Sequence, residues 1–336
     1  MKLAQLTRSQ EWWDHKTPQV LSFAYATALL TKVSLYELLF PAFFIILIGF
    51  ILVAIYAGII NDLTDLEIDI ACGKSNMMLR LKPVTRWLLT LSSLMLVLMV
   101  TYFIYPDIYA VSFYLCIAIA ISSYSFPPVR LKNRGFWGVI ACAAAEHLFP
   151  TLFSIAIVAH FSGWVLDFTW LTAAGIVAFC HGLRSILWHQ FLDRENDLKS
   201  GIKTYVSTIN PDSFKLKSLI IFAVEIMALI TILFKLGFGF PLVFLLIYLI
   251  FIFIRQKVFK SEIIIIVSKK DTHFQMLMLD YYALFFPLSL LVYASYTQAY
   301  GWVVLIAHLL LFHKIALNVC MDAYHICKSI YKKIIN

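Results

Sequence analysis

The sequence predicts an all-α fold, a polytopic membrane bundle of nine or ten transmembrane helices. Hydrophobic residues make up 62% of the 336 positions, only 14% are charged, and the mean hydropathy is +0.85. A soluble domain carries about 25% charged residues, so a soluble globular protein is excluded. Apolar stretches of the roughly 17–25 residues that cross a bilayer recur along the chain and leave no room for a soluble domain.

The expected spans follow one another with few long interruptions. In chain order they cover residues 19–36, 39–60, 85–105, 108–127, 136–160, 167–190, 215–236, 239–256, 278–297 and 300–320. The first is short, and only Ala299-Tyr300-Gly301 separates the last two, so the total is nine or ten. We expect a single domain over 1–336, with a core at about 15–300 and a terminal helix and basic tail at 301–336. No cleavable signal peptide is expected, because Met1–Pro18 is polar.

Basic residues lie mainly in the loops that follow the even-numbered spans. They are Arg80, Lys82, Arg86, Arg130, Lys132, Arg134, Arg194, Lys199, Lys203, Lys215, Lys217, Arg255, Lys257, Lys260, Lys269 and Lys270. By the positive-inside rule we expect these loops to be cytoplasmic, and we expect the membrane to be a bacterial-type inner or cytoplasmic membrane. The rule also accounts for the net charge of +8, so no nucleic-acid partner is expected. The longest polar intervals, 61–84, 191–214 and 257–276, share this face, and we expect the active site to face the cytoplasm.

The six cysteines show no CxxC pairing, and four of them fall within expected spans. They are therefore expected to be reduced and structural, rather than a disulfide framework or a zinc site.

Two acidic runs follow the second and sixth spans. Asn61, Asp65 and Asp69 are spaced i, i+4, i+8, so they share one face of a continuing helix. Asp193 and Asp197 repeat this spacing. Carboxylates beside a membrane span are costly unless a cation binds them.

Oxygen ligands without histidine or cysteine suit Mg²⁺ better than zinc or copper. Lysines and arginines near both runs would complete a cradle for a diphosphate. The alternative is a pair of solvated acidic helix ends, which is improbable for two runs at matching helix ends.

These runs resemble the two aspartate motifs of the UbiA superfamily of intramembrane prenyltransferases. Asn61-Asp62-x-x-Asp65-x-x-x-Asp69 is similar to the first motif, and Asp193-x-x-x-Asp197 to the second. The segment Tyr124–Lys132, which reads Tyr-Ser-Phe-Pro-Pro-Val-Arg-Leu-Lys, resembles a third element after the fourth helix of the family. The resemblance covers roughly residues 15–300.

The resemblance implies a helical bundle around a central cavity, capped by cytoplasmic loops, and a Mg²⁺-dependent prenyltransferase, a transferase of alkyl groups other than methyl. Its partners are an isoprenyl diphosphate donor, a small-molecule or lipid acceptor and the membrane lipid. The implied metal ligands are Asn61, Asp65, Asp69, Asp193 and Asp197. The implied diphosphate-binding residues are Lys74, Tyr124, Arg130, Lys132, Lys199 and Lys203. The candidate catalytic residues are Asp62, Asp65 and Asp193 from these motifs, together with His189 from a polar stripe on the sixth span.

Polar residues inside two further spans are candidates for the acceptor pocket. His181, Ser185 and His189 form a stripe in steps of four that leads to Asp193. Glu146-His147 lies in the middle of the fifth span, where it could bind or deprotonate the acceptor. Both groups could equally be structural. The remaining candidates are Lys16, at the start of the first span, and Arg184, whose counter-charge is expected to be Glu146 or an anionic acceptor.

Two departures from the family pattern leave the acceptor open. Gly73-Lys74-Ser75-Asn76-Met77 replaces a Lys-x-Arg-Pro-type segment, and Lys16-Thr17-Pro18 replaces the Arg-Pro pair of many aromatic-acid prenyltransferases. A terpene cyclase on the same bundle is the main alternative function. A cation-coupled transporter is less favoured, because the acids lie at helix ends and few Gly or Pro residues break the spans. The sequence does not set the donor length or the oligomeric state.

Overall fold

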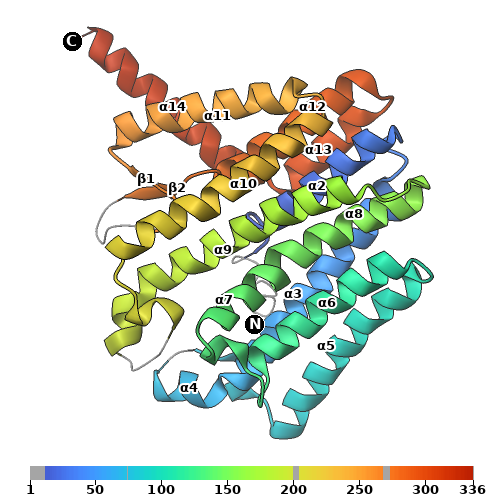
Figure 1. Cartoon of the computed structure of the whole chain (residues 1–336), viewed down its shortest axis with the longest axis vertical. Helices are drawn as coiled ribbons and strands as arrows, with labels where there is room; N and C mark the ends of the chain where they lie inside the picture. Colours follow the sequence, from blue (N-terminus) through green and yellow to red (C-terminus); the bar gives the residue numbers. More distant parts are fainter. Residues whose placement is uncertain (1–11, 74, 200–203, 268–272, 336) are drawn as a thin grey trace.

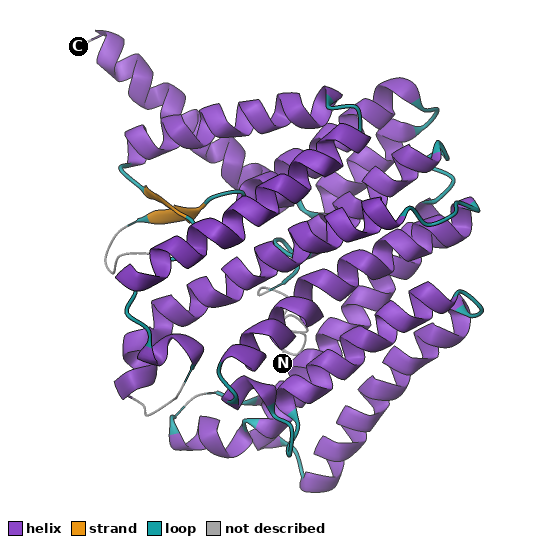
Figure 2. Cartoon of the chain, in the orientation of Figure 1, coloured by secondary structure: helices purple, strands orange, loops and turns teal. Residues whose placement is uncertain are grey.

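The computed structural model of the chain describes residues 12–73, 75–199, 204–267 and 273–335. Helices account for most of these residues, and a single two-stranded sheet is found among them (Figure 2). Most of the long helices lie beside one another and run roughly from the upper right to the lower left of Figure 1, whereas α14 extends toward the upper left. The predicted all-α class is confirmed.

Seven helical segments in the described ranges are long and apolar enough to cross a membrane. Their helices are α3 (Ile45–Thr64), α5 (Pro83–Ile104), α6 (Ile108–Ser125), α7 (Phe136–Ala143) continued by α8 (Phe149–Ser162), α9 (Phe168–Lys199), α10 (Lys215–Lys235) and α11 (Gly239–Phe259). Each coincides with one of the predicted spans, and the chain is an integral membrane protein by the length and composition of these helices.

Four other helices do not qualify as spans on their own, three because they are too short and α14 because it is too polar. They are α2 (Thr17–Thr31), α12 (Phe286–Thr297), α13 (Gly301–Leu311) and α14 (His313–Ile335). The chain bends by 82° between α13 and α14, so the predicted continuous span 300–320 is wrong, and the bent pair counts as one span at most. The described residues therefore contain seven candidate spans, or eight if the bent pair is one span. The total of nine or ten transmembrane helices stays a prediction.

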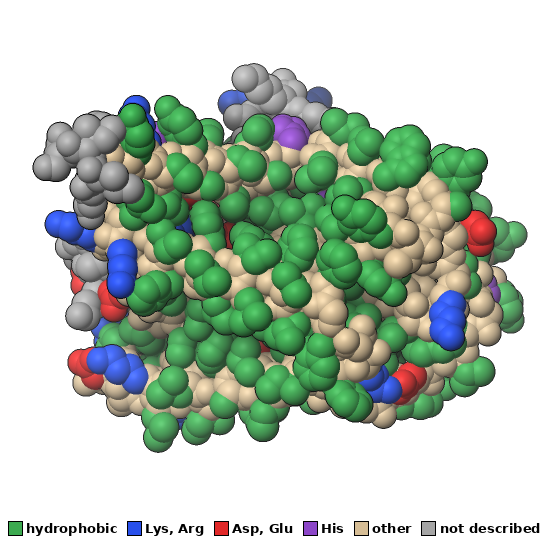
Figure 3. Space-filling model, turned by 90° about the horizontal axis from the view of Figure 1, so that it is seen from above, with side chains coloured by type: hydrophobic (Ala, Val, Ile, Leu, Met, Phe, Trp, Pro, Cys, Tyr) green, Lys and Arg blue, Asp and Glu red, His purple; other side chains and the backbone are tan. Residues whose placement is uncertain are grey.

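The helices divide into an inner and an outer set. In the α7–α8 segment 72% of the apolar stretch is buried inside the protein, whereas in α11 only 11% is. The short helix α2 is also internal, since it packs against α8 and α12 and buries most of its length. Figure 3 shows the apolar outer surface, with charged side chains mostly toward its two ends. A surface of this kind suits contact with lipid chains.

Prolines follow π-helical turns at two places in the inner helices. The turn at Ala144–Leu148 ends two residues before Pro150, and the turn at Tyr281–Phe285 ends two residues before Pro287. Proline has no N–H for the helical ladder, so the turn before it widens to accommodate an extra residue. The first turn contains Glu146 and His147, and it therefore sets the direction of both side chains.

Three small elements lie near the ends of the long helices. The helix α4 (Leu66–Ala71) follows α3 directly, and the strands β1 (Glu262–Ile264) and β2 (Phe274–Met276) pair in parallel. The β2 residues Phe274, Gln275 and Met276 line the central cavity described below, so the sheet forms part of its wall.

Candidate active site

The first acidic run lies at the junction of α3 and α4. The backbone of Asp65 departs from helical geometry there, but its N–H still bonds to the Asn61 carbonyl at 2.9 Å. The N–H of Asp69 bonds in turn to the Asp65 carbonyl at 2.8 Å. The helical spacing expected for these three residues therefore continues across the junction. In Figure 1, α4 and the C-terminal part of α9 both lie toward the left of the bundle.

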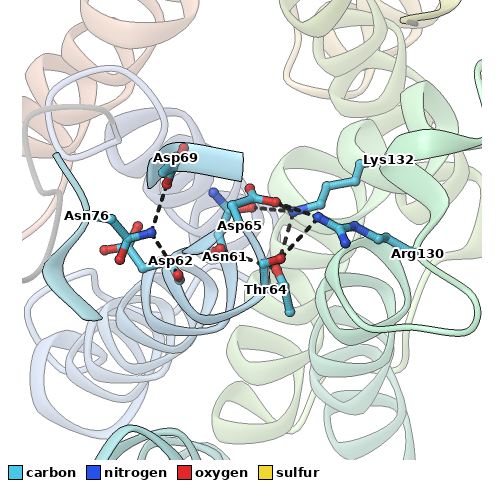
Figure 4. Close-up of polar contacts among 8 residues, drawn as sticks. All are labelled: Asn61, Asp62, Thr64, Asp65, Asp69, Asn76, Arg130 and Lys132. Atoms are coloured by element: carbon cyan, nitrogen blue, oxygen red, sulfur yellow. Dashed lines mark hydrogen bonds and ion pairs between the residues drawn. The ribbon is translucent and has the colours of Figure 1, made fainter. Parts of the chain in front are cut away.

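Two cations from the loop after α6 converge on Asp65 (Figure 4). The guanidinium of Arg130 donates to the Asp65 carboxylate at 2.8 Å, and the Lys132 ammonium donates to the same oxygen at 2.6 Å. Lys132 also donates to the Asn61 side-chain oxygen at 3.1 Å, and Arg130 to the Thr64 carbonyl at 3.1 Å. The first and third sequence elements are thus joined into one cluster, here called the rim cluster (Asn61, Thr64, Asp65, Arg130 and Lys132).

The rim cluster has features of an anion-binding site. Arg130 adopts a left-handed backbone with φ of 34°, a strained conformation for a residue with a side chain. Its Nε is buried and has no hydrogen-bond partner in the part of the chain that is described. Burial lowers the pKa of Lys132 from the ordinary lysine value, although the Asp65 hydrogen bond and charge act in the opposite direction.

Asn76 is a member of this region that sequence reasoning missed. Its amide donates to the Asp69 carboxylate at 2.8 Å and to the Asp62 carbonyl at 2.8 Å (Figure 4). Its side-chain oxygen accepts from the Met78 N–H at 2.8 Å and so caps a short 3₁₀ turn. The sequence signal that could have identified Asn76 is an asparagine at a helix-capping position shortly after a glycine.

The second acidic run lies near the C-terminal end of α9. Asp193 is exposed and Asp197 is partly buried. Among the described residues no group of three or more His, Cys, Asp or Glu side chains is arranged to hold a metal ion. Three predicted diphosphate-binding side chains, those of Lys74, Lys199 and Lys203, lie outside the described part of the structure.

A cavity of about 860 Å³ extends from the first acidic run into the bundle. Most of its wall is apolar and aromatic. Its lining brings together the predicted site residues Asn61, Tyr124, Lys16, Glu146, His147, His181 and His189. The cavity therefore joins the rim cluster, through Asn61, to the candidates for the acceptor pocket.

The predicted Glu146-His147 pair is oriented by residues at the start of α2. The Lys16 ammonium donates to the Glu146 carboxylate at 2.6 Å. The His147 Nδ1 lies 3.1 Å from the Gln19 side-chain oxygen. Gln19 was not singled out in the sequence, because one glutamine on an apolar helix has no distinguishing pattern.

Arg184 does not belong to the cavity wall. Its side chain is 0% exposed, and its Nε donates to the Glu225 carboxylate at 2.8 Å. It also donates to the Leu277 carbonyl at 2.7 Å, while the Tyr282 hydroxyl donates to Glu225 at 2.9 Å. The expected counter-charge, Glu146 or an anionic acceptor, is wrong: a buried charge needs a close partner, and Glu225 on α10 supplies it.

The site combines hard oxygen ligands, cationic donors and a long apolar chamber. Such a combination can hold a polyanionic head group at the rim and an apolar chain inside. Lys16, Glu146 and His147 line the same chamber and would contact a second molecule bound there.

Comparison with known proteins gave matches of two kinds. The UbiA prenyltransferase family matches residues 20–263. A structure of a UbiA homologue from Archaeoglobus fulgidus aligns with a TM-score of 0.56 at 18% identity, over 88% of this chain and 98% of that chain. A second, of a UbiA homologue from the same organism bound to Cd²⁺, gives 0.57 at 18% identity, over 90% and 99%. These structures share the fold, and no curated protein matches the chain.

Proposed function

The chain belongs to the UbiA prenyltransferase family, and from this premise we propose that it transfers an isoprenyl chain from a diphosphate donor to an acceptor within the membrane. The observation that carries the proposal is the position of the rim cluster beside the cavity of about 860 Å³. A diphosphate needs cations, and its prenyl chain needs an apolar chamber. The rim cluster and the cavity meet at Asn61, which belongs to the cluster and also lines the cavity.

The ligand chemistry of the acidic runs fits Mg²⁺. The side chains offer carboxylate and amide oxygens, and Mg²⁺ typically uses one or two carboxylates together with substrate phosphates and waters. A dedicated cage of three carboxylates is therefore not required. We assign the metal ligands to Asn61, Asp65, Asp69, Asp193 and Asp197, and Asp62 to the same catalytic turn.

Departure of the diphosphate concentrates negative charge at the rim. Bound Mg²⁺ would supply Lewis-acid neutralisation of that charge. Arg130 and Lys132 already point their donors at this region, and they would stabilise the diphosphate oxygens as the bond to carbon C1 breaks. We assign the same role to Lys74, Lys199 and Lys203, which follow the two acidic runs in the sequence, and to Tyr124 in the cavity wall.

The inner part of the cavity suits the acceptor. Its apolar wall excludes water, which would otherwise capture an allylic cation. We assign Lys16, Glu146, His147 and His181 to the acceptor pocket, with His189 near the second motif. The acceptor is an aromatic, quinone-precursor or lipid-like molecule. We assign this face to the cytoplasm, because the basic loops at the rim follow the positive-inside rule, and the protein to a bacterial-type inner or cytoplasmic membrane.

The test uses the full chain in lipid bilayers with geranyl diphosphate as donor. Asp65→Asn and Asp193→Asn should each lower Mg²⁺-dependent diphosphate release by about 10²–10³-fold, because a group that stabilises developing charge is lost. Glu67→Gln is the matched control, since Glu67 is an exposed acid in the same run but off the i, i+4 series. Release that is unchanged in both aspartate variants contradicts the proposal.

The products of the same reaction separate the competing functions. A prenylated acceptor supports the transferase. A cyclic hydrocarbon or alcohol formed from the donor alone identifies a terpene cyclase. Metal-dependent uptake into vesicles without diphosphate release identifies a transporter.

A further inference from the structure

His147 lines the cavity, and one of its ring nitrogens has no hydrogen-bond partner among the described residues. The side chain is 4% exposed and lines the chamber together with Glu146 and His181. Its Nδ1 contacts the Gln19 side-chain oxygen at 3.1 Å, while its Nε2 is buried without a hydrogen-bond partner in the described structure. A buried ring nitrogen of this kind needs a partner, and the residue that carries it borders a cavity large enough for a ligand.

The local fold holds this imidazole in place from two sides. The π-helical turn before Pro150 directs the side chain, and Gly182 on α9 allows α9 to approach it closely. A Cβ at Gly182 would lie 3.0 Å from the His147 Cδ2 and 3.1 Å from the Ala143 carbonyl oxygen. Any larger residue at 182 would therefore move the imidazole or the helix.

The hydrogen bond to Gln19 determines what the free nitrogen can do. An amide oxygen only accepts hydrogen bonds, so with that oxygen facing Nδ1 the proton is on Nδ1. The Nε2 of the neutral ring then carries a lone pair. A base whose far nitrogen is held by an orienting group has the geometry needed to take a proton from a bound hydroxyl.

The charges in the cavity wall cancel in pairs. Two ion pairs account for the carboxylates and for the lysine and arginine side chains among the described residues of the wall. Lys16 pairs with Glu146 at 2.6 Å, and Arg255 pairs with Asp280 at 2.9 Å. Arg255 is bound further by Asp322, at 2.8 Å. A carboxylate on the acceptor would have to displace one of these partners, whereas a neutral hydroxyl would not.

On the premise of the prenyltransferase function above, we propose that the acceptor is an uncharged molecule with a hydroxyl group and that His147 Nε2 accepts the hydroxyl proton during transfer. The hydroxyl oxygen forms a bond to C1 of the prenyl chain, and the bond from C1 to the diphosphate oxygen breaks. Its electron pair leaves with the diphosphate. The proton moves from the hydroxyl to Nε2 and then to solvent, so the products are a prenyl ether, diphosphate and one proton. Gln19 is a positioning residue for this base.

His308 provides a matched comparison within the chain. It is 1% exposed, its Nδ1 contacts the Tyr25 hydroxyl at 3.3 Å, and its Nε2 also has no partner in the described residues. It is not part of the cavity wall. An unpaired nitrogen alone therefore marks no site, and for His147 the adjoining chamber makes the difference.

The class of the acceptor can be tested without knowing its identity. The full chain, Mg²⁺ and labelled geranyl diphosphate are incubated with a total lipid extract of the source cells. Acetylation of the extract should abolish label transfer, and mild saponification should restore it, while esterification of carboxylates should leave it intact. Transfer that survives acetylation, or that is lost on esterification, overturns the proposal. Diphosphate release is followed in parallel, and its absence would count against the prenyltransferase function itself.

The role of His147 is tested by a set of variants with two readouts. His147→Gln should lower kcat for transfer by at least about 100-fold, the size of a general-base contribution, with the dissociation constant for geranyl diphosphate within about twofold. Gln19→Leu should lower kcat, and Gln19→Glu, which still accepts the Nδ1 hydrogen bond, should restore most of it. His308→Gln should leave kcat unchanged. Equal kcat in the His147→Gln and His308→Gln proteins, or no difference between the two Gln19 variants, contradicts the assignment.

Discussion

Two clusters of carboxylates and cations in this protein use the same chemistry in opposite settings. In the rim cluster, Asp65 is bound by Arg130 and Lys132, and its side chain is 21% exposed. Inside the bundle, Glu225 is bound by Arg184, and both side chains are 0% exposed. Only the rim cluster can exchange its partners for a ligand from outside.

The hydrogen bonds explain this difference. The Glu225 carboxylate accepts hydrogen bonds from Arg184 and from the Tyr282 hydroxyl. Arg184 also donates to the carbonyl of Leu277, the residue after β2. This network ties α9 and α10 to the wall of the cavity. The rim cluster leaves the buried Nε of Arg130 unsatisfied within the described structure. The buried pair therefore stabilises the bundle, and the rim cluster is left available for substrate.

The largest effect should come from breaking the buried pair. Glu225→Ala should lower the free energy of unfolding by about 3–5 kcal/mol, because it leaves a buried guanidinium without its counter-charge. The double variant Arg184→Met with Glu225→Leu should be much milder, since it removes both charges. Unfolding in mixed detergent micelles, followed by circular dichroism, measures both. A single variant no less stable than the double one contradicts a structural role for the pair.

A smaller effect is expected when a cation is removed from the rim cluster. Lys132→Met should weaken binding of geranyl diphosphate by about 10- to 100-fold, equivalent to ~1.5–3 kcal/mol for hydrogen bonds to a charged group. Lys217→Met, at an exposed lysine in contact with the Phe214 ring, is the control for general loss of positive charge. Equal losses in the two variants would indicate long-range attraction in place of direct contact. Equilibrium dialysis with labelled donor gives both constants.

The sequence identified the rim cluster more fully than the buried pair. Asp65 and Lys132 belong to separate motifs, and the family resemblance implied that these motifs contribute to one diphosphate site. The partner of Arg184 could not be read in this way, because Glu225 lies 41 residues away on another helix and has no motif around it. The choice between Glu146 and Glu225 depends on helix rotation, which the nearly uniform hydrophobicity of these spans does not reveal.

Other features depended on geometry that sequence patterns do not encode. Asn76 reaches Asp69 through a turn whose residues resembled a departure from the family motif. The break at Phe312 lies directly before His313 and Lys314, with no proline or glycine to mark it, and it divides one predicted span into α13 and α14. The hydrogen bond from His147 to Gln19 joins residues 128 positions apart. Such contacts arise from tertiary packing, whereas spans and motif spacing are local properties.

The central claim is that the rim cluster binds a diphosphate together with Mg²⁺. Its most direct test is the affinity for geranyl diphosphate, measured with and without Mg²⁺ in the wild-type and Asp65→Asn proteins, after confirming that both unfold at similar detergent concentrations. Mg²⁺ should tighten binding at least about tenfold in the wild type, because the metal bridges carboxylate and phosphate oxygens, and should have little effect in Asp65→Asn. The same gain in affinity from Mg²⁺ in both proteins would contradict the account.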